Sequence, residues 1–277
     1  MKQLLMPNVQ SKNLFENITS LKNIESRIKL DEIKPKIIER YKFYEDNSTN
    51  LENIIDTSNF TESKNLLKSC YGDNLHFNEA RRKIREVAKG KCPFCGIGIP
   101  STIDHYFCQD QYPEFSIFLP NLVPCCWECN TTKGVKMVSE NSTRKFIHFY
   151  FDNLPIEKFL FIEPEFDCGI PMTKIRLNFN HANETTEIIK NHFTALKLIQ
   201  KYKETLNEKL DDVVKTIIEH SKTMTIDEIR ETLRSVHRPL ERKYGANFWE
   251  TCLYDGVINK ADFIESVIEN SLFLIAL

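Results

Sequence analysis

The sequence predicts a mainly α-helical protein that carries one small, metal-stapled unit between two helical regions. Apolar residues recur at spacings of three and four on both sides of the middle of the chain, which is the pattern of amphipathic helices. The middle itself is rich in glycine and proline and holds two Cys-x-x-Cys pairs. We therefore expect three regions: helical residues 1–90, a compact unit over residues 91–140, and helical residues 141–277.

The N-terminal region is expected to form at least three helices. The first follows apolar residues spaced three and four apart within residues 30–44. A second begins after Thr61, whose hydroxyl is suited to capping a helix N-terminus. A third covers about residues 76–88, and Gly90 ends it because glycine readily adopts the left-handed conformation.

The C-terminal region returns to a helical pattern after a connecting segment broken by prolines. Apolar residues at a spacing of three and four over residues 188–217 predict one long helix or a closely joined pair. Thr225 is followed three residues later by Glu228, a capping-box pattern that begins a further helix. The apolar stretch over residues 249–277 is expected to belong to a core.

Composition limits the class and the compartment. No apolar stretch approaches the roughly 20 residues needed to span a bilayer, and the N-terminal apolar run is too short for a signal peptide. We therefore expect a cytoplasmic protein. Nine cysteines is an odd number, and disulfides are not the default explanation for cysteines in a chain without an export signal.

The formal net charge of −2 does not by itself indicate a nucleic-acid partner. Positive charge is nevertheless concentrated within residues 81–91, where a single acid, Glu86, stands among six basic residues: Arg81, Arg82, Lys83, Arg85, Lys89 and Lys91. Such a run is ordinarily a solvated helix face. Because it directly precedes the first cysteine pair, a surface that contacts phosphates is the alternative interpretation.

Two matched cysteine pairs predict a structural zinc site. Cys92-Pro-Phe-Cys95 and Cys126-Trp-Glu-Cys129 are separated by 30 residues, and two residues between paired cysteines let one backbone turn supply two thiolates to a tetrahedral zinc ion. A redox Cys-x-x-Cys would belong beside a βαβ pattern, which is not seen. Cys125 could compete with Cys126, but only Cys126 keeps the two-residue gap. The five other cysteines are expected to be small buried apolar residues: Cys70, Cys108, Cys125, Cys168 and Cys252.

Residues between and after the cysteine pairs carry a second pattern. In order along the chain stand Asp104-His105, Asn121-Leu-Val-Pro, and Asn130-Thr-Thr-Lys133 directly after the last cysteine. This arrangement resembles the HNH nuclease family, whose ββα-metal motif has Asp-His, Asn-Leu, Cys-x-x-Cys-Asn or Cys-x-x-Cys-His, and then x-x-Lys. The match covers roughly 45 residues. The chain departs from the common pattern where Tyr106-Phe107-Cys108 replaces a proline that usually follows Asp-His.

The chemistry of these residue types suits phosphodiester hydrolysis. Histidine is a suitable general base near neutral pH, and the resemblance implies that role for His105. Carboxylate and amide oxygens suit magnesium or manganese, which the resemblance assigns to Asp104 and Asn130. Lys133 shares a helix face with Asn130 and is expected to reach a phosphate. The resemblance also implies that the amide of Asn121 braces the loop before the second strand.

The directions of the Asp104 and His105 side chains, and the roles of Glu114 and His148, are not fixed by the motif. Adjacent residues on a strand point to opposite faces, so Asp104 and His105 can serve one phosphate only if the cation and the attacking water lie on different sides, or if the strand ends there. Glu114 and His148 are weaker candidates, each expected to be structural.

The residues of the motif resemble those of a narrower group, the HNH subunits of Septu-type anti-phage systems. Some of these systems accompany retrons. This resemblance implies a DNA substrate, a partner ATPase and activation by invasion. Two alternatives remain: a non-catalytic zinc-ribbon adaptor, and a stand-alone restriction or homing nuclease. The latter would need a sequence-reading element, which the helical flanks do not show.

Overall fold

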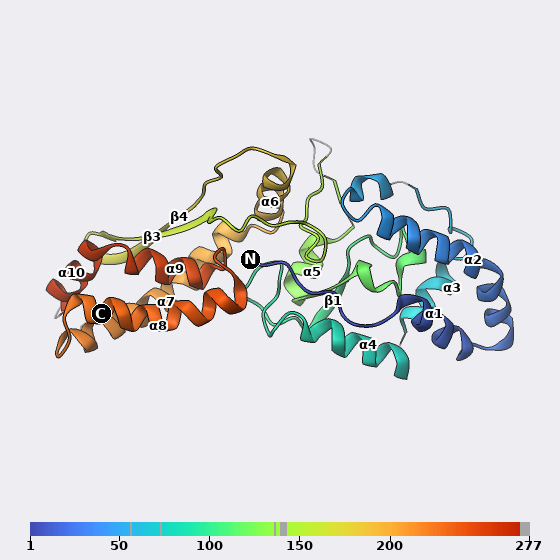
Figure 1. Ribbon diagram of the computed structural model, residues 1–277, viewed down its shortest axis with the longest axis horizontal. Helices are drawn as coiled ribbons and strands as arrows, with labels where there is room; N and C mark the ends of the chain where they lie inside the picture. Colours follow the sequence, from blue (N-terminus) through green and yellow to red (C-terminus); the bar gives the residue numbers. More distant parts are fainter. Residues whose placement is uncertain (56, 73, 136, 139–142, 272–277) are drawn as a thin grey trace. The chain divides into compact units, whose positions relative to one another are not determined.

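The computed structural model describes residues 1–277 except 56, 73, 136, 139–142 and 272–277, and it is mainly helical, as expected (Figure 1). The chain divides into two compact units. The N-terminal unit comprises Gln3–Asn153 and Glu187–Leu196, and the C-terminal unit comprises Met1–Lys2, Leu154–Thr186 and Lys197–Leu277. The regions 1–90 and 91–140 thus share one unit, because the first helices pack around the cysteine-rich segment.

Four helices precede the cysteine-rich segment: α1 (Ser11–Ser20), α2 (Ile24–Asp46), α3 (Lys64–Lys68) and α4 (Leu75–Glu86). Asn23 and Asn74 cap α2 and α4 by accepting hydrogen bonds from backbone N–H groups three residues on. The prediction that Thr61 caps a helix was wrong, because α3 begins at Lys64 and its N-cap residue is Ser63. Short 3-10 turns at Leu51–Ile54 and Ser69–Tyr71 complete this part.

Two short strands and a helix follow, namely β1 (Thr102–His105), β2 (Leu122–Cys125) and α5 (Trp127–Lys133). β1 and β2 pair antiparallel, with Asp104 opposite Val123 and His105 opposite Leu122. The loop between the strands holds 3-10 turns at Pro113–Phe115 and Leu119–Asn121.

An aromatic cluster fastens that loop to α2. The fully buried Tyr44 of α2 contacts the rings of Phe107, Phe115 and Phe118 at centroid distances of 5.0–5.5 Å. Tyr41, one turn earlier, stacks on Phe118 at 4.2 Å. Aromatic pairs of this kind contribute packing beyond their buried area, so α2 holds the loop that joins the two strands.

The C-terminal unit contains a hairpin that the sequence pattern did not predict. β3 (Leu160–Asp167) and β4 (Ile170–Leu177) pair antiparallel in the segment expected to be a proline-broken connection. A two-stranded sheet has only edges, where Pro164 is tolerated. Cys168 and Gly169 form the turn with positive φ values of 50° and 83°, as a tight hairpin requires. Cys168 is therefore exposed, and its expected burial was wrong.

Helices α7 (Leu198–Ser221), α8 (Ile226–Tyr244), α9 (Trp249–Ile258) and α10 (Ala261–Glu269) complete the C-terminal unit, with α9 against β3 and α7 against β4 (Figure 1). The expected long helix is a closely joined pair, since Lys197 at φ +53° separates α6 (Glu184–Ala195) from α7. Thr225 and Glu228 form the predicted capping box of α8. The apolar stretch from Trp249 is buried as far as Val267, while residues 272–277 lie outside the described part.

Within the described part of the chain, no helix combines the length and the apolar character that crossing a membrane would require.

Candidate functional site

Four buried thiols form a cluster suited to a metal ion such as zinc. The sulfur atoms of Cys92, Cys95, Cys126 and Cys129 all lie within 4.8 Å of one another. The four predicted cysteines, with Cys126 and not its neighbour Cys125, are therefore positioned to bind a metal ion. Hydrogen bonds from neighbouring thiols, first that of Cys125, lower the pKa of Cys92 to about 4, which favours the thiolate form that binds metal.

Backbone N–H groups support the sulfur atoms. The N–H of Ile97 lies 3.4 Å from Cys95 Sγ, and the N–H of Cys126 lies 3.3 Å from Cys92 Sγ. Gly98 lies directly against Cys126, where a Cβ atom would come within 2.7 Å of Cys126 Cβ. Position 98 thus has no room for a side chain, which brings the first cysteine turn close to the start of α5.

One face of β1 packs against one face of α5. Thr102 and Asp104 share a face of the strand because they are two residues apart, and Asn130 and Lys133 share a face of the helix because they are three apart. Asn130 Nδ2 donates to Thr102 Oγ1 at 3.2 Å, and Lys133 Nζ lies 3.1 Å from Asp104 Oδ2. Two of the predicted metal-binding residues, Asp104 and Asn130, therefore occupy the same interface.

Lys133 does not have the position that the sequence suggested. Its side chain is fully buried, and its ammonium donates to the carbonyl oxygens of His105 and Tyr106 at 3.1 and 2.9 Å in addition to its ion pair with Asp104. Because its ammonium is buried and held by these groups, it does not reach a phosphate at the surface. That expectation was wrong, because the helix face it shares with Asn130 packs on β1 instead of facing solvent.

Asp104 is a buried carboxylate with incomplete hydrogen bonding. Its Oδ2 atom has Lys133 at ion-pair distance but receives no hydrogen bond of normal geometry. Burial raises the pKa of Asp104, and the nearby Lys133 ammonium acts in the opposite direction. A buried oxygen in this state is a suitable ligand for a hard cation.

His105 points to the other side of β1. Its Nε2 atom lies 2.9 Å from the carbonyl oxygen of Ser116 and 2.7 Å from the side-chain amide of Gln109. The ring of Tyr71 packs edge-on against the imidazole at 4.4 Å. Burial, aided by the positive charges of Lys133 and Arg81, lowers the pKa of His105 to about 4, so the ring is neutral near pH 7.

Asn121 braces the loop between the two strands. Its Oδ1 accepts the N–H of Phe107 at 2.7 Å, and its Nδ2 donates to the carbonyls of Phe107 and Phe115 at 3.0 and 3.3 Å. The side chain is fully buried, so Asn121 supports the geometry around His105 without facing a substrate.

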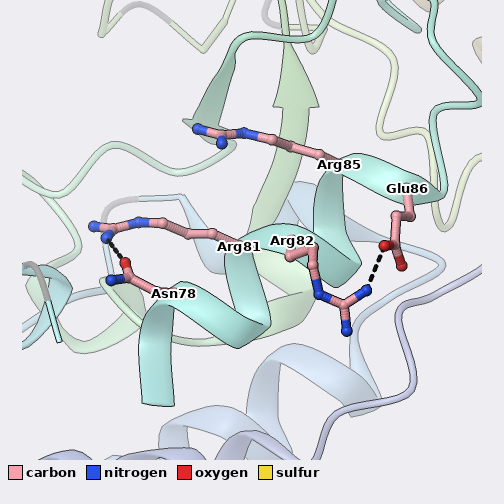
Figure 2. A pocket seen from close by; sticks show the side chains of 5 residues that line it. All are labelled: Asn78, Arg81, Arg82, Arg85 and Glu86. Carbon is pink, nitrogen blue, oxygen red and sulfur yellow. Dashed lines mark hydrogen bonds and ion pairs between the residues drawn. The ribbon is translucent and has the colours of Figure 1, made fainter. Parts of the chain in front are cut away.

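Three arginines of α4, Arg81, Arg82 and Arg85, line a surface pocket of about 430 Å³ together with Asn78 and Glu86 (Figure 2). Arg82 pairs with Glu86 at 2.5 Å, and Arg85 donates to the carbonyl of Ser101 at 3.1 Å, just before β1. Arg81 donates to Asn78 and lies over the rings of Tyr71 and Phe77 at 4.8 and 4.4 Å. Lys83 pairs with Glu79 and does not line this pocket.

Tyr71 connects the arginine pocket with His105, since one ring contacts both Arg81 and the imidazole. Tyr71, Gln109, Ser116 and Thr102 all contact predicted site residues, yet none belongs to a motif. Tyr71 is the last residue of a 3-10 turn 34 positions before His105, and no spacing rule links such distant residues. Only the packing of the unit reveals them.

Glu114 and His148 are structural, as expected. Glu114 is buried and pairs with Arg40 at 3.1 Å. His148 is buried in the aromatic core, with Nε2 at 3.0 Å from the hydroxyl of Tyr44.

The thiol cluster makes a direct prediction about zinc content. Purified protein should carry about one zinc ion per chain by elemental analysis, and Cys92→Ser or Cys129→Ser should lose it because three thiolates hold zinc less well than four. Cys125→Ala, a change at the buried neighbour of Cys126, should keep the zinc. Zinc retained by both serine variants, or lost from Cys125→Ala with the fold intact, would contradict the ligand assignment.

The chain is 28% identical over 227 residues to Protein ea31 of Escherichia phage lambda, an alignment that covers 76% of each chain. No protein-family model and no solved structure matches it.

Proposed function

We propose that the N-terminal unit is an HNH-type, metal-dependent endonuclease that hydrolyses DNA phosphodiesters. The observation that carries this proposal is the setting of His105. His105 is a neutral imidazole at the end of β1, and its Nε2 lies at hydrogen-bond distance from the backbone carbonyl of Ser116. Its ring contacts Tyr71, which in turn contacts Arg81 of the arginine-lined pocket. The order β1, β2, α5 around the thiol cluster supports the proposal, because a ββα-metal unit would have its elements in this order.

The hydrogen bonding of His105 favours one tautomer. A carbonyl oxygen can only accept, so the general-base role requires the tautomer in which Nε2 carries the proton and donates it to Ser116. Nδ1 is left with a lone pair that can accept a proton from an attacking water. This is the general-base role, and a neutral ring is its required starting state.

Asp104 and Asn130 would hold the divalent cation. Oxygen donors of this type fit magnesium or manganese, and the buried Asp104 carboxylate lacks a full set of hydrogen bonds. Because Asn130 turns its amide nitrogen to Thr102, its oxygen is the atom left to coordinate. When bound, the cation would stabilise the negative charge that develops on the phosphate and leaving oxygen. Lys133 holds Asp104 in place and offsets its charge. The arginines of α4 would therefore contact the phosphate in place of Lys133.

Cleavage by this chain should depend on His105. Plasmid DNA should be nicked or cut with magnesium or manganese and remain intact with chelator. His105→Ala should slow cutting by about 10²–10⁴-fold because the general base is lost, with zinc content unchanged. The exposed His181→Ala is the matched control and should cut normally. Equal cutting by both variants would rule out His105 as the base.

Asp104→Asn and Asn130→Ala address the cation in the same assay, since both should raise the concentration of magnesium needed for half-maximal cutting. An unchanged magnesium requirement in both would remove these residues from the cation site.

The α4 pocket should bind phosphate without reading sequence. Arg82→Ala and Arg85→Ala should each weaken DNA binding to a similar extent for unrelated sequences, and each should reduce the slope of log affinity against log salt by about 1. Lys83→Ala, on the same helix but outside the pocket, is the control and should leave the slope unchanged. A salt slope that no arginine change alters would mean that α4 is a solvated face.

We further propose that the nuclease works with a partner ATPase, as the resemblance to Septu-type subunits implies. The described helical flanks carry no separate DNA-reading module, and the net charge of −2 favours a partner that delivers DNA. Pull-down of the intact chain from its native host, followed by mass measurement, should recover a complex that contains an ATPase. A chain that stays alone and cuts DNA efficiently would defeat the partnership and leave the nuclease assignment intact.

A further inference from the structure

Trp127 is exposed at a place where its neighbours are firmly held. Its side chain is 68% exposed, whereas the other tryptophan, Trp249, is 4% exposed. It is the first residue of α5 and lies between Cys126 and Cys129, whose buried sulfurs belong to the thiol cluster. The thiol cluster thus holds the backbone on both sides of position 127, and the large indole contributes little to the core. Tryptophan is enriched at interfaces, where its ring can stack on a partner.

The indole belongs to the same short helix as Asn130, one of the residues proposed to hold the cation. Asn130 follows it by three positions, which places the two side chains one turn apart on neighbouring parts of the helix surface. Thr131 Oγ1 donates to the carbonyl of Trp127 at 2.9 Å, so the polar residue one turn on is also fixed. An extended ligand that meets Asn130 can therefore reach Trp127.

Two cationic side chains bind the segment 97–101, which touches Cys126, the residue before Trp127, through Gly98. Lys91 lies 3.5 Å from the carbonyl of Ile97 at one end of that segment, and Arg85 donates to the carbonyl of Ser101 at the other. Proteins hold single-stranded nucleic acids by stacking bases on aromatic rings and by placing phosphates on cationic side chains.

We infer that Trp127 is a stacking platform for an unpaired nucleobase of the nucleic-acid strand bound at this site. The inference rests on the proposed nuclease function and adds a substrate feature to it: the strand next to the site is locally unpaired, because a base within a duplex does not offer its face to an indole. Stacking on an aromatic ring is tolerant of base identity, so Trp127 would favour single-stranded or frayed substrates without selecting a sequence.

The test uses the full chain carrying His105→Ala, in magnesium, so that the nucleic acid stays intact. Tryptophan fluorescence is followed during titration with a single-stranded DNA oligonucleotide, an abasic oligonucleotide of equal length, the corresponding RNA and a blunt duplex. Emission should fall with the single strands and not with the abasic strand, since only a base can stack. Titration with the RNA shows whether replacing deoxyribose by ribose changes the stacking contact.

Matched substitutions of Trp127 separate stacking from folding. Trp127→Phe leaves only the buried Trp249 and should abolish the fluorescence change while keeping affinity within about twofold, because phenylalanine also stacks. Trp127→Ala should weaken single-strand binding about tenfold, measured by anisotropy of a labelled oligonucleotide, and should weaken duplex binding less. Zinc content of each variant confirms that the thiol cluster is intact.

Three results would overturn the inference: unchanged single-strand affinity in zinc-replete Trp127→Ala, equal quenching by the abasic strand, or a protein partner that is lost on Trp127→Ala while DNA binding is not. The last would identify the indole as a protein-docking residue. These results differ from a failure of the nuclease proposal, which would appear as absent cutting by the unaltered chain even where base-dependent quenching persists.

Discussion

Four thiols within 4.8 Å of one another hold together the part of the chain on which the candidate site depends. The segment between the cysteine pairs contains two four-residue strands and a loop with many prolines, too little regular structure to stand on its own hydrophobic core. Joining Cys92 and Cys95 to Cys126 and Cys129 brings both ends of this segment together. β1 and α5 can then pack because the residues that flank them share one cluster of thiols suited to a metal ion.

α5 has seven residues, yet it serves two structural purposes and one proposed binding role. Cys129 points to the thiols, Asn130 and Lys133 face β1, and Trp127 faces solvent. Lys133 is the least expected of these. A fully buried ammonium is costly unless it is paired, and here Asp104 and two carbonyl oxygens at the end of β1 satisfy it. The same contacts define where β1 ends, and therefore where His105 lies.

β1 separates the two proposed chemical functions between its faces. Asp104 faces α5 and His105 faces Tyr71, so a phosphate at the end of the strand would have the cation ligands on one side and the base on the other. Asn121 and the aromatic cluster around Tyr44 fix the loop that supplies Ser116 and Gln109 to the imidazole. The helical wrapping of α2 and α4 therefore contributes directly to the geometry of the site, including the arginine pocket.

Local patterns alone determined the helical class, the four metal-binding cysteines, the capping box at Thr225 and the identity of the motif residues, because spacing and residue chemistry act over a few positions of the chain. The sequence pattern did not predict the hairpin of β3 and β4. Prolines are acceptable in a strand only where the strand lies at the edge of a sheet, and a strand's place in a sheet is not visible in the local sequence. Tertiary packing decided that Lys133 is buried against Asp104, that Tyr71 touches His105, and that Trp127 is exposed. Each depends on which faces of distant elements meet, and no short-range rule of sequence contains that information.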